Sequence, residues 1–342
     1  MIIPEYYSYS QYLQHPKFKA IRKIVMDRAN GICEDCKANP ATEPHHLKYP
    51  KWGTFDVPEN LVAVCHNCHC MRHRKRNYMP VINGIGISPE TPIKQDHFKT
   101  IVEKHLKIVC DGIFKKNYGW VENNKYFYYD MNAGSGFYEG IVGSPLIFLN
   151  EAIKYRHVQF NVYLFEIEPD NIVQLERIVS EAHYPPNINI HYIQKDSSVY
   201  LTDYLFYSHN QQFGMVYSDP TGSVPPFDTL AKFSQRKYCQ RTDIVINFAA
   251  STIKRIRGSS KCIERRCLTD YLSVISKKAW IIRENHGKHQ WTFLIGANWI
   301  NFPEFRGIGF RYADSAEGQS ILDNLNMSAR EKKTCRQQSL VV

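Results

Sequence analysis

The chain has 342 residues, 43% of them hydrophobic and 13% aromatic, which is enough for two folded domains of ordinary size. Its formal net charge of +10 favours a polyanionic partner, nucleic acid before an anionic membrane surface, although solubility alone also accounts for such a charge. No apolar run approaches the roughly 20 residues that span a bilayer, and residues 1–7 lack a signal-peptide pattern, so we expect a cytoplasmic protein with no membrane partner.

The first predicted element is a helix over residues 17–30, where apolar residues recur at helical spacing with basic residues between them. Asn30-Gly31 is a stop signal for this helix. A short apolar strand is predicted at residues 62–65 and a second, strongly basic helix at residues 68–76, and we expect a small ββα module here. Two Cys-x-x-Cys pairs lie among these elements: Cys33 with Cys36, and Cys65 with Cys68.

The two cysteine pairs predict one zinc ion held by four thiolates. Five of the ten cysteines lie within residues 33–70, which fits one metal cluster in a reducing compartment. Four sulfur ligands close the shell of the ion, so we expect a structural zinc that supplies the stability so small a core lacks. Two alternatives stay open: His45 or His46 replaces a cysteine, or a shifted pairing uses Cys70 and His73.

A His-His pair, an asparagine and a further histidine accompany the cysteine pairs: His45-His46, Asn60 and His69. This order resembles the HNH endonuclease family. The resemblance implies metal-assisted phosphodiester hydrolysis, with His46 as the general base and Asn60 bracing the loop that carries it. It also implies that His45 and His69 bind one divalent cation, with His73 in reserve. The identity of that ion stays open among Mg²⁺, Mn²⁺ and Ni²⁺.

The basic run after the last cysteine pair predicts contact with DNA phosphates. Its candidate residues are Arg72, Arg74, Lys75 and Arg76. A solvated charged face is the plain alternative for this run. For the module as a whole, the alternative is a zinc ribbon that binds nucleic acid without cleaving it, and Asn60 alone could be an ordinary turn residue.

The pattern changes towards the second half of the chain. Residues 79–97 contain several Pro and Gly with little periodicity and are predicted to be a linker. Helical segments then alternate with apolar strands, which predicts an α/β fold with a mostly parallel sheet covered on both faces. The predicted strands are 126–130, 162–166, 188–192, 214–218 and 243–247. We therefore expect a module at 1–78, a linker at 79–97, an α/β domain at 98–327 and a polar tail at 328–342.

A glycine-rich turn follows the first of these strands, at Asp130-Met-Asn-Ala-Gly-Ser-Gly136. With acidic residues after the next strands, it resembles the first motif of class I S-adenosylmethionine methyltransferases, a Rossmann-like fold. The resemblance implies that the glycines let the backbone approach the methionine part of the cofactor. It implies contacts to the ribose or the adenine from acids at the strand ends. The implied cofactor-binding residues are Asp130, Asn132, Gly134, Gly136, Glu166 (Glu168 in reserve), Asp196 and Asp219.

Residues 100–310 also resemble the three-Cys-motif partner proteins, on the glycine-rich turn together with residues 143–146, 165–168, 219–222 and 246–247. That methyltransferase-like family is usually encoded beside a separate cysteine-motif protein, so a protein partner for this domain is implied. The motif Asp219-Pro-Thr-Gly222 lacks the second proline and the aromatic residue of amino-group DNA methyltransferases. Asp219 therefore binds a ligand or simply caps a turn.

Three functions follow from these patterns. The leading one is a metal-dependent HNH endonuclease that hydrolyses DNA and is regulated or targeted by a methyltransferase-like domain, with anti-phage defence implied by family analogy. The second is an S-adenosylmethionine-dependent nucleic-acid methyltransferase with the zinc module as a targeting device. The third is a non-catalytic subunit that binds nucleic acid and regulates.

Overall fold

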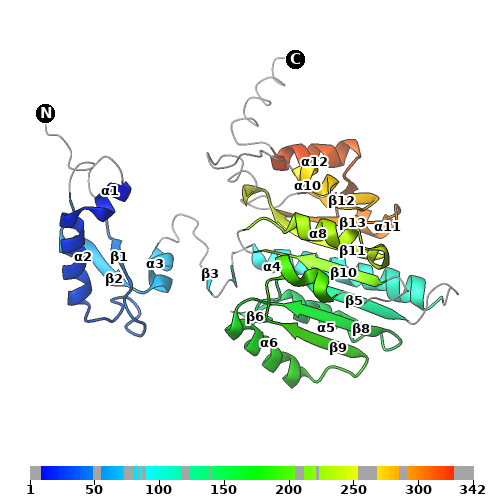
Figure 1. The fold of residues 1–342 in the computed structure, drawn as a ribbon, viewed down its shortest axis with the longest axis horizontal. Coiled ribbons are helices and arrows are strands. Elements are labelled where there is room, and N and C mark those ends of the chain that lie inside the picture. The colour runs from blue at the N-terminus through cyan, green and yellow to red at the C-terminus, as the bar shows by residue number, and fades with distance from the viewer. Residues whose placement is uncertain are drawn as a thin grey trace, which may run out of the picture. The chain divides into compact units, whose positions relative to one another are not determined.

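A computed structural model describes residues 9–48, 55–72, 81–82, 85–86, 90–116, 124–138, 140–204, 212–220, 223–252, 268–284 and 291–326. The chain divides into two compact units (Figure 1). The smaller unit comprises Met1–Ile82 with Gly86–Ser88, and the larger comprises Asn83–Ile85 with Pro89–Val342. The short strands β3 (Val81–Ile82) and β4 (Ile85–Gly86) form a two-stranded sheet.

The smaller unit is a two-stranded hairpin flanked by helices. Strand β1 (Glu43–His46) runs antiparallel to β2 (Leu61–Val64), with His46 opposite Leu61. A short turn of 3-10 helix, η1 (Pro58–Asn60), leads into β2, and α3 (His66–Arg72) follows it. The remaining helices are α1 (Tyr9–Gln14) and α2 (Pro16–Arg28). This is the predicted ββα arrangement preceded by a helix.

Helix α2 covers one face of the hairpin. Proline occupies its first turn, where no backbone N–H is needed, and His15 caps it by accepting a hydrogen bond from the Lys17 amide. Phe18 and Val25, two turns apart, are buried against Leu61 of β2. The basic residues between them point outward and are exposed.

The larger unit is built on a sheet that has eight strands among the described residues, in the order β14-β12-β13-β11-β10-β5-β8-β9 (Figure 1). Strands β11, β10, β5, β8 and β9 are parallel, whereas β13 runs antiparallel between β11 and β12. The strands span Lys125–Asp130 (β5), Gln159–Phe165 (β8), Ile188–Ile193 (β9), Phe213–Ser218 (β10), Thr242–Ala249 (β11), Ala279–Arg283 (β12), Trp291–Ala297 (β13) and Phe310–Tyr312 (β14).

Each face of this sheet has its own hydrophobic core. In the central strand β5, Tyr126 and Tyr128 pack into one core, whereas Phe127 and Tyr129 pack into the other, as the two-residue period of a strand requires. The first core lies under α4 (Thr91–Leu106), the π-helix η3 (Lys107–Phe114), α5 (Ser144–Ala152), α6 (Pro169–Ala182) and α11 (Pro303–Arg306). The second lies under α7 (Ser197–Tyr200), η4 (Leu201–Tyr204), α8 (Phe227–Ser234), η5 (Lys237–Cys239), α10 (Leu268–Ser273) and α12 (Ala316–Asn326).

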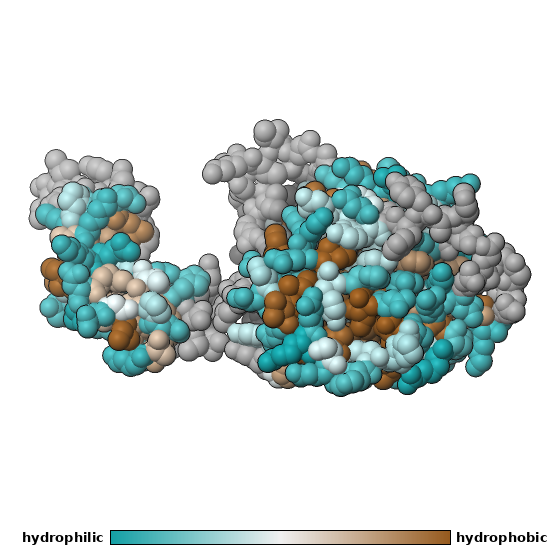
Figure 2. All heavy atoms as spheres, turned by 60° about the horizontal axis from the view of Figure 1, so that its bottom comes forward, coloured by the Kyte–Doolittle hydropathy of each residue, from teal (hydrophilic) through white to brown (hydrophobic). Residues whose placement is uncertain are grey.

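The predicted α/β fold with a mostly parallel, doubly covered sheet is confirmed. The five predicted strands correspond to β5, β8, β9, β10 and β11. A small hairpin of β6 (Phe137–Tyr138) and β7 (Ile141–Val142) lies in the glycine-rich region after β5. Figure 2 shows a mostly hydrophilic surface with hydrophobic residues in separate patches. None of the helices in the described part of the chain has the length and apolar character of a membrane span.

The linker prediction is wrong at its carboxyl end. Residues 91–97, assigned to a linker, form the first turns of α4. Pro92 falls in the first turn of this helix, where proline is favoured because its missing N–H has no partner to lose. The proline that suggested a linker therefore begins a helix.

Candidate functional site

The two Cys-x-x-Cys pairs converge in the smaller unit. The sulfur atoms of Cys33, Cys36, Cys65 and Cys68 all lie within 4.8 Å of one another. The sulfurs of Cys36 and Cys65 are 3.9 Å apart. Tetrahedral zinc with Zn–S bonds of about 2.3 Å requires sulfur–sulfur distances of about 3.8 Å. The cluster has the size and donor set of a four-thiolate zinc site and could bind zinc.

The thiols of this cluster differ in how readily they ionise. Burial opposes ionisation of Cys33, but hydrogen bonds from the backbone near Cys36, Cys65 and Asp35 outweigh it and lower the pKa of Cys33 to about 6. Burial and the neighbouring thiols raise the pKa of Cys68. A doubly charged cation among the sulfurs would stabilise all four thiolates together. Without such a cation, repulsion between the negative charges opposes their joint ionisation.

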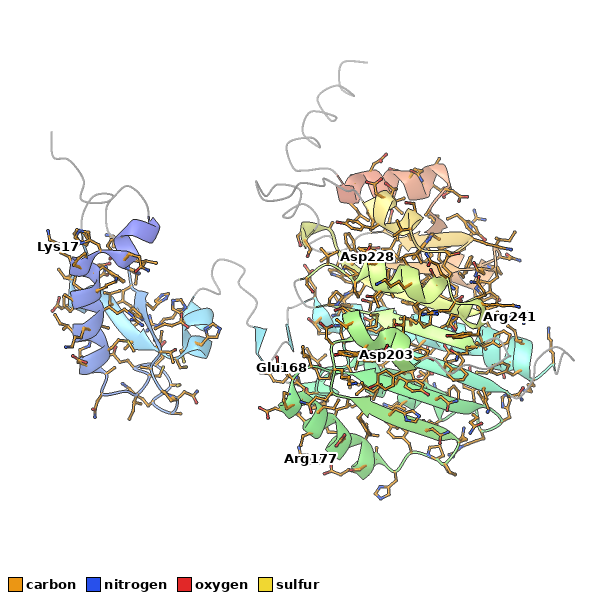
Figure 3. All side chains as sticks on the ribbon, in the orientation of Figure 1. Lys17, Glu168, Arg177, Asp203, Asp228 and Arg241 are labelled. Atoms are coloured by element: carbon orange, nitrogen blue, oxygen red, sulfur yellow. The ribbon has the colours of Figure 1, made fainter. Side chains whose placement is uncertain are left out.

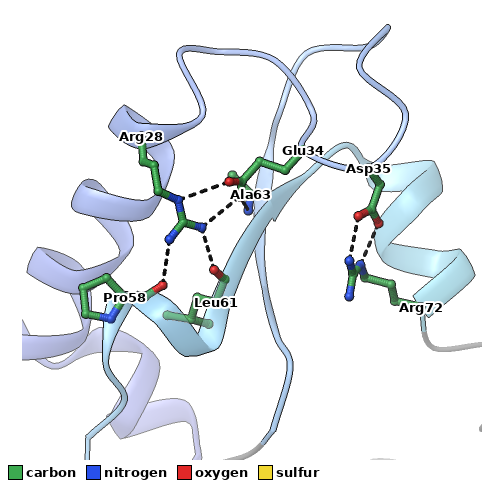
Figure 4. Close-up of polar contacts among 7 residues, drawn as sticks. All are labelled: Arg28, Glu34, Asp35, Pro58, Leu61, Ala63 and Arg72. Carbon is green, nitrogen blue, oxygen red and sulfur yellow. Dashed lines mark hydrogen bonds and ion pairs between the residues drawn. The ribbon is translucent and has the colours of Figure 1, made fainter.

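An arginine fastens the first cysteine pair to the hairpin and to helix α2 (Figure 4). The Arg28 guanidinium donates two hydrogen bonds to the Glu34 carboxylate, at 3.0 and 3.1 Å. It also donates to the backbone oxygens of Pro58 at 3.0 Å and Leu61 at 2.7 Å. Glu34 in turn accepts from the Ala63 amide at 2.6 Å. One side chain thus joins α2, the turn of 3-10 helix, β2 and the cysteine loop.

A second arginine, Arg72, forms an ion pair within the unit. Its Nε and Nη2 each lie 2.6 Å from a carboxylate oxygen of Asp35, also drawn in Figure 4. This bidentate pair holds the pKa of Asp35 below its usual range. The Arg72 guanidinium thus fastens α3 to the first cysteine pair, and its predicted contact with DNA phosphates stays a prediction.

One face of β1 gathers imidazoles and a carboxylate. Glu43 and His45 share this face because alternate residues of a strand point the same way. The Glu43 carboxylate lies 3.0 Å from Nδ1 of His69 and 2.7 Å from Nδ1 of His66. The rings of His45 and His69 meet edge to face with centroids 5.1 Å apart. The two residues predicted to bind a divalent cation therefore lie together, with Glu43 as an additional oxygen donor.

This second group is looser than the thiol cluster. Among the residues that the structure describes, the thiols are the group in which three or more donor atoms lie within 4.8 Å of one another. His45, His69 and Glu43 would have to turn their side chains to share an ion. Imidazole nitrogens with a carboxylate oxygen suit Mn²⁺, Ni²⁺ or Zn²⁺ better than Mg²⁺, which prefers oxygen donors.

His46 lies on the opposite face of β1, against α2. Its Nε2 is 2.9 Å from Oδ2 of Asp56 and 3.3 Å from the Tyr12 hydroxyl, and its ring stacks on Phe18 with centroids 5.9 Å apart. The side chain is 5% exposed. Burial lowers the pKa of His46, Asp56 acts against this, and the charge of His69 lowers it further. The imidazole is therefore neutral at pH 7 and held by a carboxylate.

His46 is covered on its own side of the strand. The resemblance made it the general base of phosphodiester hydrolysis, and that role stays a prediction. In the structure, consecutive strand residues point to opposite faces, so His46 turns to the core side while His45 turns to the side of α3.

Asn60 braces the segment that follows His46. Its Oδ1 accepts a hydrogen bond from the Lys48 amide at 3.1 Å, and its Nδ2 donates to the Lys48 carbonyl oxygen and to Oδ1 of Asp56. The Leu47 amide donates to the Asn60 carbonyl oxygen at 2.9 Å. Asn60 thus touches both the strand end and the carboxylate that holds His46. The predicted residues His73, Arg74, Lys75 and Arg76, and the side chain of Cys70, lie outside the described residues.

In the larger unit, Asp130 ends β5 and is fully buried. Its carboxylate accepts hydrogen bonds from the Tyr128 hydroxyl at 2.8 Å and the Asn132 amide at 3.1 Å. Burial raises the pKa of Asp130 to about 6, while hydrogen bonds from Ser144 and Tyr128 act in the opposite direction. The carboxylate thus binds a backbone amide of the turn that follows its own strand. The amide oxygen of Asn132 accepts from the backbone N–H of Asp219 at 3.1 Å.

The glycine-rich turn is packed against the protein itself. Gly134 and Gly136 have φ angles of 62° and 76°, which side chains rarely adopt. A Cβ on Gly136 would lie 2.6 Å from the Leu175 side chain. The close approach assigned to a cofactor is therefore made at Gly136 by a leucine of α6.

The acid at the end of β8 holds the same turn. Glu166 accepts a hydrogen bond from the Gly134 amide at 2.8 Å and from the amides of Ile167 and Glu168 at 2.9 Å each. Asp196, after β9, caps α7 by accepting from the Ser198 amide at 2.8 Å. Both predicted cofactor acids thus have backbone partners within the chain.

Asp219, at the end of β10, is paired with a lysine. Its Oδ2 lies 2.6 Å from Nζ of Lys94 on α4 and 3.2 Å from the Tyr217 hydroxyl. Its Oδ1 accepts from the Asn247 side chain at 2.7 Å. The side chains of Lys94 and Asp219 are 18% and 17% exposed. The carboxylate predicted to accept a ligand amine thus already holds an ammonium group of the protein.

Three residues of these sites were missed from the sequence. Glu43 stands two positions before His45, and strand alternation could have placed it on the same face. Asp56 stands four positions before Asn60 in a segment with no clear periodicity. Lys94 is 125 residues from Asp219, and no local pattern connects them.

No family model matches the chain. Over 86 residues it is 32% identical to the Type IV methyl-directed restriction enzyme EcoKMcrA of Escherichia coli K12. The match covers 22% of this chain and 30% of the relative, so the chain spans less than a third of that protein.

Solved structures that resemble the chain do so at low identity. Trm1 of Pyrococcus horikoshii, solved with S-adenosyl-L-methionine, has a TM-score of 0.39 at 14% identity and covers 60% of this chain and 56% of its own. Protein LPL1258 of Legionella pneumophila has a TM-score of 0.38 at 15% identity, covering 67% and 91%. The putative methyltransferase yhhF of E. coli has a TM-score of 0.33 at 12% identity, covering 65% and 92%. At these scores the comparisons carry no argument about function.

Proposed function

We propose that the smaller unit is a metal-dependent endonuclease that hydrolyses phosphodiester bonds of DNA. The observation that carries this proposal is the group of His45, His69 and Glu43 on one face of β1, beside a thiol cluster of zinc-binding size. The thiols would hold a structural zinc. The imidazoles would hold a separate divalent cation, which would stabilise charge on the phosphate and the leaving oxygen.

His46 is the proposed general base. Its Nε2 faces Asp56, so the neutral ring donates from Nε2 and carries its basic lone pair on Nδ1. The lowered pKa keeps the ring ready to accept a proton at pH 7. Because the side chain is almost covered, substrate binding has to move its neighbours before water reaches the ring. Asn60 and Asp56 act as positioning residues.

The larger unit is proposed to bind a ligand or target the nuclease without transferring methyl groups. The Lys94–Asp219 pair supports this, because the ammonium group occupies the acceptor that a target amine would need. The acids that follow β8 and β9, Glu166 and Asp196, still stand at an edge where an adenosyl-type ligand could bind. The restriction enzyme that resembles part of the chain favours DNA as substrate and a role in anti-phage defence.

The nuclease proposal is tested by plasmid cleavage. Zinc-loaded protein is incubated with supercoiled and single-stranded DNA in the presence of Mg²⁺, Mn²⁺ or Ni²⁺. We expect cleavage in at least one ion and its loss, by about 100-fold or more, in His46→Ala. The matched control is His183→Asn, because His183 is an exposed histidine of the larger unit and takes no part in the proposed site. Full cleavage by His46→Ala, or no cleavage in any ion, would refute the proposal.

Methyl transfer is tested separately in the larger unit. Equilibrium dialysis with radiolabelled S-adenosylmethionine measures binding, and transfer of label to DNA or RNA measures catalysis. We expect no transfer by the wild type and none gained by Lys94→Met, which frees Asp219. Transfer by the wild type that is lost in Asp219→Ala would replace this proposal by the methyltransferase alternative.

A further inference from the structure

The larger unit has a cavity at the amino ends of its parallel strands, opposite the edge that carries Asp130 and Asp219. Figure 3 shows Arg241, at this cavity, and Glu168, after β8, at opposite edges of the sheet. The cavity has a volume of about 300 Å³, at the lower end of the range for small-molecule sites. Its wall includes Val109, Ile113, Phe213, Arg241, Lys278 and Trp299.

The lining divides into an apolar and a cationic part. Val109 and Ile113 come from η3, and Phe213 begins β10. Arg241 lies just before β11 with its guanidinium 5.2 Å from the centre of the Phe213 ring, and Lys278 lies just before β12. Burial lowers the pKa of Arg241, because the partly covered guanidinium has lost some of its hydration. An anion in the cavity would compensate for that loss.

The carboxylate at this cavity is already bound by the protein. Oδ2 of Asp243 accepts from the indole N–H of Trp299 at 3.0 Å and lies 3.0 Å from Nε2 of His105. The other ring nitrogen of His105 is 2.8 Å from the Tyr126 hydroxyl. The ammonium group of the nearby Lys277 donates to the backbone oxygens of Cys239 and Thr242, so its hydrogen bonds are made within the protein. The positive charges at the cavity are therefore Arg241 and Lys278.

The cavity is held in shape by its rim. The side-chain amide of Asn298 donates to the backbone oxygen of Gln240 at 2.9 Å and to its side-chain oxygen at 2.6 Å. The Oδ1 of Asn298 accepts from the backbone N–H of Lys278 at 3.0 Å. The helix η3 is a π-helix, a rare element that occurs frequently at functional sites. Five segments far apart in sequence thus meet in a preformed pocket.

We propose that this cavity binds a small amphipathic anion, a planar ring that carries one carboxylate or phosphate group. The ring would lie against Val109, Ile113 and Trp299, and the anionic group would contact Arg241 and Lys278. A nucleoside monophosphate and an aromatic carboxylate share this chemistry. The proposal is independent of cleavage by the smaller unit.

The test is titration calorimetry of the full chain with four probes: phenyl phosphate, benzoate, uridine 5′-monophosphate and neutral phenol. We expect a charged probe to bind at least about tenfold more tightly than phenol, because the cations contribute charge-assisted hydrogen bonds. Arg241→Met and Lys278→Met should each weaken that binding severalfold or more. The matched control Lys237→Met changes an exposed lysine on η5 that does not line the cavity, and should bind as the wild type does.

The outcomes separate the source of the ligand from the validity of the site. Preference for uridine 5′-monophosphate identifies a nucleotide site, and preference for benzoate identifies an aromatic carboxylate site. Lys278 is exposed, so its variant keeps the fold even if Arg241→Met does not, and thermal melting checks both. No binding by any charged probe, equal binding of phenol, or charged binding unaffected by Lys278→Met and Arg241→Met would overturn the proposal.

Discussion

At the scale of single residues, the smaller unit separates two neighbouring histidines into different environments. His45 faces His69 and Glu43, in a group that could share a metal ion. His46 faces Asp56 and is buried against α2. A ligand and a base need these different surroundings, since a metal ligand must reach the ion whereas a base must hold its tautomer and stay neutral. In the proposed nuclease, strand alternation would provide both from one dipeptide.

Asp130 shows what burial does to a carboxylate in the larger unit. Its pKa rises from 3.8 to about 6, so the folded state takes up a proton before the unfolded state as pH falls. Protonation of Asp130 should therefore stabilise the larger unit increasingly as pH falls through about 6 towards 4. This stabilisation is lost as pH rises above 6. Asp130→Asn, which cannot ionise, removes this dependence.

The measurement is the unfolding free energy of the wild type and Asp130→Asn at pH 8 and pH 5. We expect the variant to gain on the wild type by up to about 3 kcal/mol at pH 8, and by only about half as much at pH 5. The comparison cancels the titration of all other groups. An identical difference at the two pH values would contradict the argument.

At the scale of elements, the strands of the larger unit were predictable because burial on both faces leaves long apolar and aromatic runs. Tyr126–Tyr129 of β5 is such a run, with its residues divided between two cores. The cysteine pairs were predictable as a cluster from their spacing alone. The partners of Glu166, Asp219 and Arg72 were not, because each comes from another element or from a backbone turn whose position only the fold determines.

The Arg28 network is the clearest element-level contact of the smaller unit. Arg28→Ala removes four hydrogen bonds that connect α2 to the cysteine loop and β2, and leaves Glu34 with the Ala63 amide alone. We expect the stability of the smaller unit to fall by about 2 kcal/mol. The loss is no larger because the guanidinium is only partly buried. Hydrogen exchange of the amides at residues 58–66 measures it. Arg22→Ala, an exposed change on the same helix, is the control.

Exchange at residues 58–66 should be about 30-fold faster in Arg28→Ala and unchanged in Arg22→Ala. Residues of β5 in the larger unit serve as an internal reference and should exchange as in the wild type. Equal protection in the two arginine variants would show that the network adds no stability.

At the scale of the whole molecule, two units of different construction share one chain. The larger has two hydrophobic cores on a broad sheet, whereas the smaller has a compact core and a thiol cluster. A structural zinc at the thiol cluster, as proposed, would make the stability of the smaller unit depend on the metal. A strong chelator should therefore abolish the calorimetric transition of the smaller unit and leave that of the larger one. Loss of both transitions, or of neither, would contradict the assignment of a structural metal.

DNA cleavage, as proposed, requires that imidazoles on β1 and α3 hold a cation separate from the zinc at the thiol cluster. The most direct test is the rate of plasmid nicking by zinc-loaded wild type and His69→Ala, with zinc content measured on the same samples. The account predicts equal zinc in both proteins and at least a 100-fold slower rate in the variant. Equal zinc with an unchanged rate would contradict it.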